Sequence, residues 1–260
     1  MTKNKTLLTK IRKSAVYKRT NIQRNTNNNK NKIRLFPNNI TKKILIIGID
    51  QAIVNTGFGI LYFDFDTNCL DVLSLFGNPK VNSDLINNLI IVNDSNRTKS
   101  WPEYESAYIE LITKLDIIKY LIKVLLLEKK LNKEELTIFV VVEDVYYGKY
   151  KNVFKGLIKQ QTIVIERFRE LWDIKTNIYE YSSSEAKSAI SVGRTKDAVS
   201  ESINKLFDLY LPTVQSVVKK EFTEQQYKYF THISDGIALA YALYKDLLKS
   251  TNNVDIFKEN

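Results

Sequence analysis

The chain has 260 residues, of which 44% are hydrophobic; this is enough for one or two domains with a sizeable core and too much for a wholly disordered protein. Its single cysteine and single histidine exclude an intramolecular disulfide and a zinc site built from those residue types alone. No stretch approaches the roughly 18 apolar residues of a membrane span, so we expect no membrane association, and the lone cysteine predicts a reducing intracellular compartment, such as the cytoplasm of a bacterium or an infected host.

The net charge of +10 is concentrated near the N-terminus. Residues 1–49 contain 13 of the 39 Lys and Arg and no acidic residue, which leaves 26 basic against 29 acidic residues in the rest of the chain. We expect residues 1–43 to form a basic, mostly disordered arm, residues 44–250 a folded domain and residues 251–260 a tail. Three functions are open for the arm: a nucleic-acid tether, an organellar transit peptide or a solubilising tail. A transit peptide would place the protein in an organelle matrix.

Hydrophobic periodicity predicts an ordered series of strands and helices in the body. In chain order we expect strands at 43–50, 57–63 and 69–76, a polar excursion at 77–101, a helix at 102–130, a strand at 137–143, a helix at 153–172, a short strand at 177–181, helices at 185–191 and 196–209, an ambiguous segment with helical character at 212–230, and a final helix at 234–248. Short connections favour an antiparallel meander for the first three strands, and strands separated by helices favour parallel neighbours. This predicts an α/β fold, a mixed sheet with helices on both faces, in the ribonuclease H-like order.

Two carboxylates stand where the most apolar strands end. Asp50 follows Ile44–Ile49, and Glu143 follows Ile138–Val142. A buried acid is costly unless it is paired or binds a metal ion. If the two strands are central neighbours, their ends meet at one edge of the sheet, and ligand sites of open α/β sheets lie beyond such an edge. A polar residue that simply ends a strand remains the alternative for each acid.

A third candidate element is the segment around the only histidine. His232 and Asp235 are three residues apart, so both can face one way on the final helix. A capping role for Asp235 and a structural role for His232 are the alternatives.

Four blocks of sequence resemble, in order, those of the RuvC family of Holliday junction resolvases. The first is Ile47-Gly-Ile-Asp50 followed by Asn55-Thr-Gly57, and the second runs from Val140 through Glu143 and Tyr146 to Lys149. The last two are as follows: Ser184-Glu-Ala-Lys187, with Lys196 beyond it, and His232-x-x-Asp235-x-x-Ala-Leu-Ala. The chain departs from the family pattern at Gln51-Ala52, where the family often has Pro-Gly, and in the shorter turn between the two lysines.

The resemblance implies a crossover junction endodeoxyribonuclease that resolves four-way DNA junctions by paired, symmetric phosphodiester hydrolysis. It implies two Mg²⁺ ions per site, with Mn²⁺ as a substitute, and no small-molecule cofactor. The implied metal ligands are Asp50, Glu143, His232 and Asp235. Lys187 would act on the scissile phosphate, and the implied DNA contacts are Tyr146, Lys149, Lys151, Lys187 and Lys196.

A two-fold junction predicts a homodimer, with the apolar helix at 153–172 as one candidate interface and burial in the monomer as the alternative for that helix. Two other activities share these acids: another ribonuclease H-like nuclease, acting on RNA–DNA hybrids or other branched DNA, and a non-catalytic junction-binding protein. An actin-like nucleotide-binding fold would need further glycine-rich turns, and no two of the eight glycines lie close together after Gly59.

Overall fold

The structure is a computed structural model of the whole chain, which divides into two compact units, Met1–Phe36 and Pro37–Asn260. The residues it describes are 34–37, 39–51, 56–67, 69–77, 84–86, 89–92, 103–145, 151–172, 177–190, 195–209, 211–221 and 223–251. The architecture below is that of the second unit. None of the helices in these ranges is long and apolar enough to cross a membrane.

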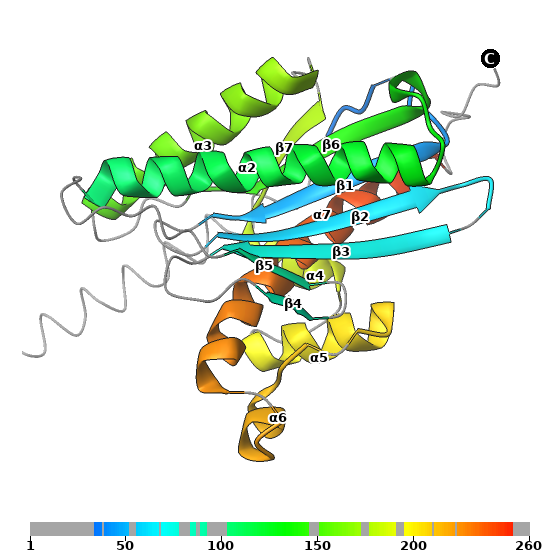
Figure 1. Ribbon diagram of the computed structural model, residues 1–260. Helices are drawn as coiled ribbons and strands as arrows, with labels where there is room; N and C mark the ends of the chain where they lie inside the picture. The colour runs from blue at the N-terminus through cyan, green and yellow to red at the C-terminus, as the bar shows by residue number, and fades with distance from the viewer. Residues whose placement is uncertain are drawn as a thin grey trace, which may run out of the picture. The chain divides into compact units, whose positions relative to one another are not determined.

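A mixed sheet of seven strands forms the centre of this unit, in the order β4-β5-β3-β2-β1-β6-β7 (Figure 1). The strands are β1 (Lys43–Asp50), β2 (Thr56–Asp64), β3 (Cys69–Gly77), β4 (Asp84–Ile86), β5 (Leu89–Val92), β6 (Leu136–Glu143) and β7 (Ile178–Tyr181). The first three form the predicted antiparallel meander, and β1, β6 and β7 run parallel to one another. β1 therefore lies between its sequence neighbour β2 and β6, which follows it by more than 80 residues.

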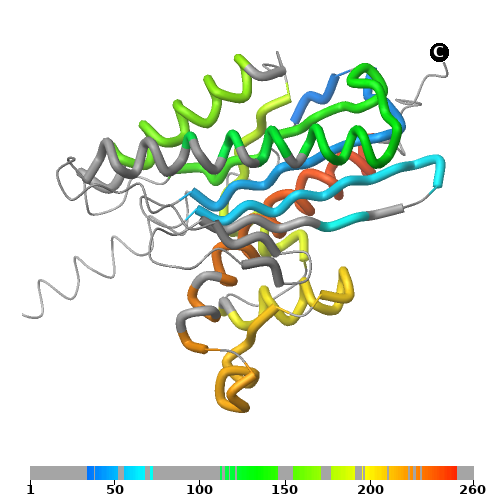
Figure 2. The backbone as a smooth tube through the Cα atoms, viewed as in Figure 1, coloured from blue at the N-terminus to red at the C-terminus, as the bar shows by residue number. Residues whose placement is uncertain are grey.

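One face of the sheet is covered by α2 (Glu103–Glu128) and α3 (Lys151–Trp172) (Figure 2). Because side chains alternate along a strand, every second residue of β1 points to this face. The shared core is apolar and almost completely buried: Leu45, Ile47 and Ile49 of β1, Ile138, Val140 and Val142 of β6, Leu115, Ile118 and Ile122 of α2, and Val164 and Phe168 of α3. The predicted interface helix at 153–172 thus buries one of its apolar sides in its own domain.

The opposite face is covered by the long helix α7 (Glu224–Thr251), which approaches the sheet unusually closely. A Cβ atom at Gly48 of β1 would come within 2.0 Å of the carbonyl oxygen of Gly236 on α7. Only glycine fits at such a backbone-to-backbone contact. Three shorter helices complete this side: α4 (Ser183–Ala189), α5 (Lys196–Phe207) and α6 (Val214–Val218). Of these, α4 and α5 pack on α7. The fold class is the one predicted, an α/β fold of the ribonuclease H-like kind with a mixed sheet and helices on both faces.

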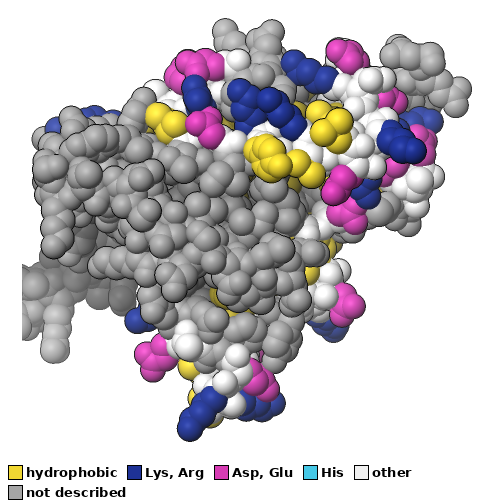
Figure 3. Space-filling view, viewed as in Figure 1, with side chains coloured by type: hydrophobic (Ala, Val, Ile, Leu, Met, Phe, Trp, Pro, Cys, Tyr) yellow, Lys and Arg dark blue, Asp and Glu magenta, His cyan; other side chains and the backbone are white. Residues whose placement is uncertain are grey.

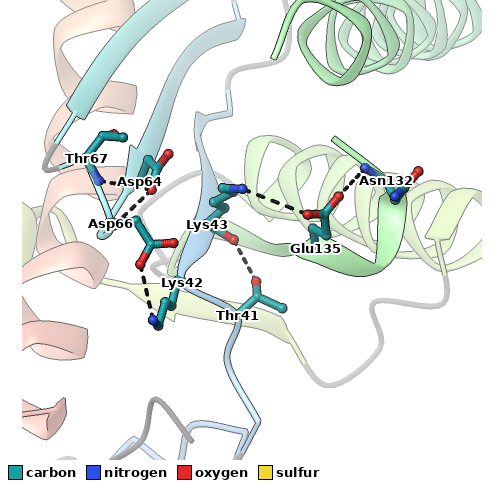
Figure 4. A network of polar contacts seen from close by, with 8 residues as sticks. All are labelled: Thr41, Lys42, Lys43, Asp64, Asp66, Thr67, Asn132 and Glu135. Atoms are coloured by element: carbon teal, nitrogen blue, oxygen red, sulfur yellow. Dashed lines mark hydrogen bonds and ion pairs between the residues drawn. The ribbon is translucent and has the colours of Figure 1, made fainter. Parts of the chain in front are cut away.

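Polar contacts fix the chain where β1 begins, at the end of the sheet remote from Asp50 (Figure 4). The main-chain N–H of Thr41 donates to the Thr137 hydroxyl over 2.9 Å, which ties the entry of β1 to β6. Lys42 pairs with Asp66 in the β2–β3 turn at 3.2 Å. Asp64 in turn accepts a hydrogen bond from the main-chain N–H of Asp66. These contacts help to hold the register of β1 between β2 and β6.

Two parts of the fold differ from the prediction. The excursion at 77–101 contributes two short strands, β4 and β5, which extend the sheet beyond β3. The final helix begins at Glu224 rather than near residue 234, because the polar segment before His232 is helical as well. His232 and Asp235 therefore lie inside a helix, and a capping role for Asp235 is excluded.

Candidate active site

Asp50 and Glu143 lie side by side at the carboxyl ends of β1 and β6. The parallel register pairs Ile49 with Val142, so the next residue of each strand is the acid. Strand alternation turns both acids away from the core formed with α2 and α3 and towards the face that α7 covers. The Glu143 carboxyl is hydrogen-bonded to that of Asp50, which is itself only 7% exposed. The sequence prediction that these two strand ends meet is confirmed.

α7 brings His232 onto the same strand end. The Nδ1 atom of His232 lies 2.6 Å from Oδ2 of Asp50, although 182 positions separate the two residues in the chain. This short contact depends on the close packing of α7 on β1 and β2, which the glycines at the interface permit. Asp235 follows one helical turn later, and its charge acts on Glu143.

The electrostatics of Glu143 reflect this crowding of acids. The pKa of the Glu143 carboxyl is raised to about 8, mainly by burial, and also by the negative charge of Asp50, the hydrogen bond to Asp50 and the negative charge of Asp235. Carboxylates that act on one another in this way repel each other unless a proton or a cation neutralises them. The site consequently favours the binding of positive charge.

Lys187 supplies one positive charge near the carboxylates. It lies in the last turn of α4, whose start is fixed by a capping box in which the Ser182 hydroxyl accepts from the main-chain N–H of Glu185, and the Glu185 carboxylate accepts from the N–H of Ser182. The Lys187 charge lowers the pKa of Glu143, against the stronger influences that raise it. Lys187 therefore lies close enough to the carboxylates for its charge to act on them.

The remaining predicted DNA contacts are only partly placed. Lys151 and Lys196 are the first residues of α3 and α5. Tyr146 and Lys149 lie outside the described residues.

Gln51, which our sequence reasoning treated only as a departure from the family pattern, ties the end of β1 to the end of β6. Its side chain is 7% exposed, and its Nε2 donates to the main-chain carbonyl of Glu143 over 3.0 Å. The sequence offered one signal of this burial: Gln51 directly follows an acid at the end of a buried strand.

The donor chemistry of this site suits a hard divalent cation. Carboxylate oxygens are the ligands that Mg²⁺ prefers, and an imidazole suits Mn²⁺. The mutual repulsion that raises the pKa of Glu143 is the kind that a cation relieves. Within the described ranges, no three His, Cys, Asp or Glu side chains are already arranged as a metal site.

Among known proteins, the chain is similar to solved structures only. No protein-family model matches the sequence, and no curated protein matches it. Among solved structures, the chain is similar to RuvC of T. thermophilus in complex with a Holliday junction substrate, with 13% identity and a TM-score of 0.43. That likeness covers 79% of this chain and 96% of the other. At this level of similarity it carries no weight in assigning the function or the site residues.

Proposed function

We propose that this protein is a metal-dependent endonuclease that cuts four-way DNA junctions. The observation that carries the proposal is the convergence of acids from β1, β6 and α7 at one end of the sheet, with His232 at 2.6 Å from Asp50 and Lys187 near enough to act on Glu143. Such a cluster favours cations, and phosphodiester hydrolysis needs cations and general electrostatic stabilisation of a phosphate.

In this proposal Asp50, Glu143, His232 and Asp235 hold two Mg²⁺ ions, with Mn²⁺ as a substitute. When bound, such cations supply charge neutralisation at the scissile phosphate and a more acidic water. Lys187 stabilises negative charge on the phosphate from the α4 side. The buried position of Asp50, between the two other acid-bearing elements, suits it to serve both cations.

The choice of a four-way junction as substrate rests on the four sequence blocks and their order. A junction has two equivalent strands to cut, so we propose a homodimer with one site per subunit and paired, symmetric nicks. Apolar side chains remain at the surface of α2 and α3, in the region where Figure 3 shows hydrophobic groups beside Lys and Arg. They include Tyr120 and Leu127, which are 65% and 78% exposed, and Ile158, which is 39% exposed.

A cleavage assay tests the proposal directly. The full chain is incubated with an end-labelled four-way junction, a linear duplex of matched sequence or an RNA–DNA hybrid, with Mg²⁺, Mn²⁺ or a chelator. We expect paired nicks in the junction only, and only with a divalent cation. Cleavage of the hybrid instead would assign another ribonuclease H-like activity, and junction binding without cleavage in either cation would assign a non-catalytic binding protein.

Two aspartate variants give this assay its controls. Asp50→Asn removes the charge at the centre of the cluster, and we expect at least a 100-fold loss of cleavage with junction binding retained, because binding rests mainly on contacts to phosphates. Asp116→Asn changes an exposed acid on α2 that pairs with Arg167 at 2.9 Å, on the other face of the sheet. It should cleave like the unmodified protein; equal activity of the Asp50 variant would refute the site.

A further inference from the structure

The position of Lys187 depends on how the short helix α4 is held. α4 has only seven residues, and an isolated helix of that length is not stable in water. It lies against α7, so contacts with neighbouring elements must keep it in place (Figure 1). Because Lys187 is in the last turn, loosening of that end of α4 would displace its side chain most.

The start of α4 is tied to α7 through the residue that precedes its capping box. Tyr181, the last residue of β7, is buried, and its hydroxyl donates to Oδ2 of Asp246 on α7 over 2.9 Å. The N-cap residue Ser182 follows directly in the chain. This end of α4 is therefore fixed both by the sheet and by α7.

The other end of α4 receives hydrogen bonds from two neighbouring helices. Nζ of Lys245, on α7, donates to the main-chain carbonyl of Ala189 over 3.0 Å. The Ser202 hydroxyl, on α5, donates to the carbonyl of Ile190 over 2.9 Å. The last carbonyls of a helix have no partner within the helix, and a cation placed there also opposes the negative end of the helix dipole. The two donors therefore stabilise the end of α4 that carries Lys187.

We propose that Lys245 is a positioning residue, which keeps Lys187 in place for cleavage by holding the end of α4. This inference rests on the proposed function, because it concerns the lysine that acts there on the scissile phosphate. α7 also carries His232 and Asp235. The helix that supplies two candidate metal ligands thus also sets the position of the lysine that must act beside them.

Single-turnover cleavage of the four-way junction, at saturating protein and Mg²⁺, tests this role. Lys245→Met keeps the approximate length of the side chain and removes the donor. We expect the rate to fall about 10-fold, since a small misplacement of a catalytic group is costly. The dissociation constant for the junction and the Mg²⁺ concentration at half-maximal rate should stay unchanged. Lys245→Arg keeps a cationic donor at the end of α4 and should restore most of the rate.

A double variant separates an effect through Lys187 from a general loss of structure. Lys187→Met alone should reduce the rate about 100-fold, and adding Lys245→Met should reduce it no further. Ser202→Ala removes the second donor, and it should cause a smaller loss that is likewise absent in the Lys187→Met background. Urea unfolding verifies that each variant is folded.

Lys249 offers a matched control on α7. It lies one turn beyond Lys245, but its Nζ pairs with the Asp246 carboxylate over 3.1 Å rather than with the end of α4. An exposed ion pair of this kind contributes little to stability. Lys249→Met should therefore cleave the junction at the unmodified rate.

The outcomes separate this inference from the proposed function. An unchanged rate in Lys245→Met overturns the positioning role alone, as does a loss in the double variant that is as large as in the single one. A weaker junction affinity at an unchanged rate also overturns it, because Lys245 would then be a DNA contact. If the unmodified protein cuts no junction with any divalent cation, the proposed function fails, and this inference fails with it.

Discussion

Gly57 lies directly against the main chain of His232: a Cβ atom at Gly57 would come within 2.3 Å of both the carbonyl carbon and the carbonyl oxygen of that residue. The strand β2 thus sets how near α7 comes to the sheet at the level of the active site. A residue with no side chain thereby controls the position of the only imidazole in the protein.

Gly57→Ala is accordingly expected to disturb the site as well as the fold. The added methyl group meets backbone, which cannot rotate away, so α7 must shift, and we expect a loss of stability of about 1–3 kcal/mol. Junction cleavage should fall by more than the loss of folded protein explains. Urea unfolding and cleavage rates measure the two effects. Gly156→Ala, inside α3, is the control and should not destabilise the protein, because alanine favours the helical conformation. Unchanged stability and activity in Gly57→Ala would contradict the close packing of α7 on β2.

The contact between His232 and Asp50 predicts a graded response to substitution of the histidine. His232→Ala removes one candidate ligand together with the partner of Asp50, and it should lose most cleavage activity while remaining folded. His232→Asp should stay active and shift its preference from Mn²⁺ towards Mg²⁺, since oxygen replaces nitrogen as the donor. Cleavage rates over a range of each metal ion measure this shift. Wild-type cleavage by His232→Ala in limiting metal would leave the site to the three carboxylates.

Glu143 predicts how stability depends on pH in the absence of divalent cations. Its carboxyl keeps a proton in the folded protein up to about pH 8, whereas the unfolded chain releases that proton near its ordinary pKa of 4.5. The stability contributed by the protonated form is thus complete below about pH 4.5 and is lost as pH rises through 8, at no more than about 1.4 kcal/mol per pH unit.

Glu143→Gln removes this titration. The variant should gain stability relative to the unmodified protein between pH 5 and pH 9, as measured by urea unfolding with a chelator present. Added Mg²⁺ should narrow the gap, because a cation stabilises the ionised carboxylate. Glu134→Gln, at an exposed position before β6, is the control. A constant difference between Glu143→Gln and the unmodified protein at every pH would disprove the raised pKa.

The basic N-terminal segment predicts a salt effect on DNA binding that is separable from cleavage. Residues 1–36 contain 11 Lys and Arg and no acid, and the second compact unit starts at Pro37. Deleting residues 2–36 should weaken junction affinity and flatten its salt dependence, since each phosphate contact contributes about 0.9 to the slope of log affinity against log salt. Cleavage at saturating protein should persist. An unchanged slope would leave a targeting or solubilising role for the segment.

The elements of this fold with strong local patterns could be predicted from the sequence. β1 and β6 are continuous apolar runs that end in an acid, and that pattern indicated their burial. The meeting of Asp50 with Glu143 followed only if the two strands were neighbours, as their parallel pairing shows. The start of α7 was misplaced because residues 224–229 are polar or tyrosine, so hydrophobic periodicity is weak there although the helix forms. The short strands β4 and β5 were missed because their three or four residues gain their structure from pairing with β3, a tertiary contact with no local signal.

The contacts among the candidate site residues could not be predicted from the sequence. The sequence indicated that His232 and Asp235 share a helix face, but the short distance from His232 to Asp50 depends on four glycines that bring α7 against β1 and β2. The burial of Gln51 was missed for a similar reason, because it depends on the strand beside it rather than on the neighbours of Gln51 in sequence.

The pairing of Asp50 with His232 also determines when the candidate active site is completed during synthesis of the chain. The two residues are 182 positions apart, which at about 5–20 residues per second corresponds to roughly 10–40 s of translation. Until α7 leaves the ribosome, the nascent chain presents two acids on a sheet that lacks its covering helix. If the proposed function is correct, a ribosome-bound chain would therefore be unable to cut nucleic acid, including the messenger RNA being translated, and a product truncated before α7 would be inactive.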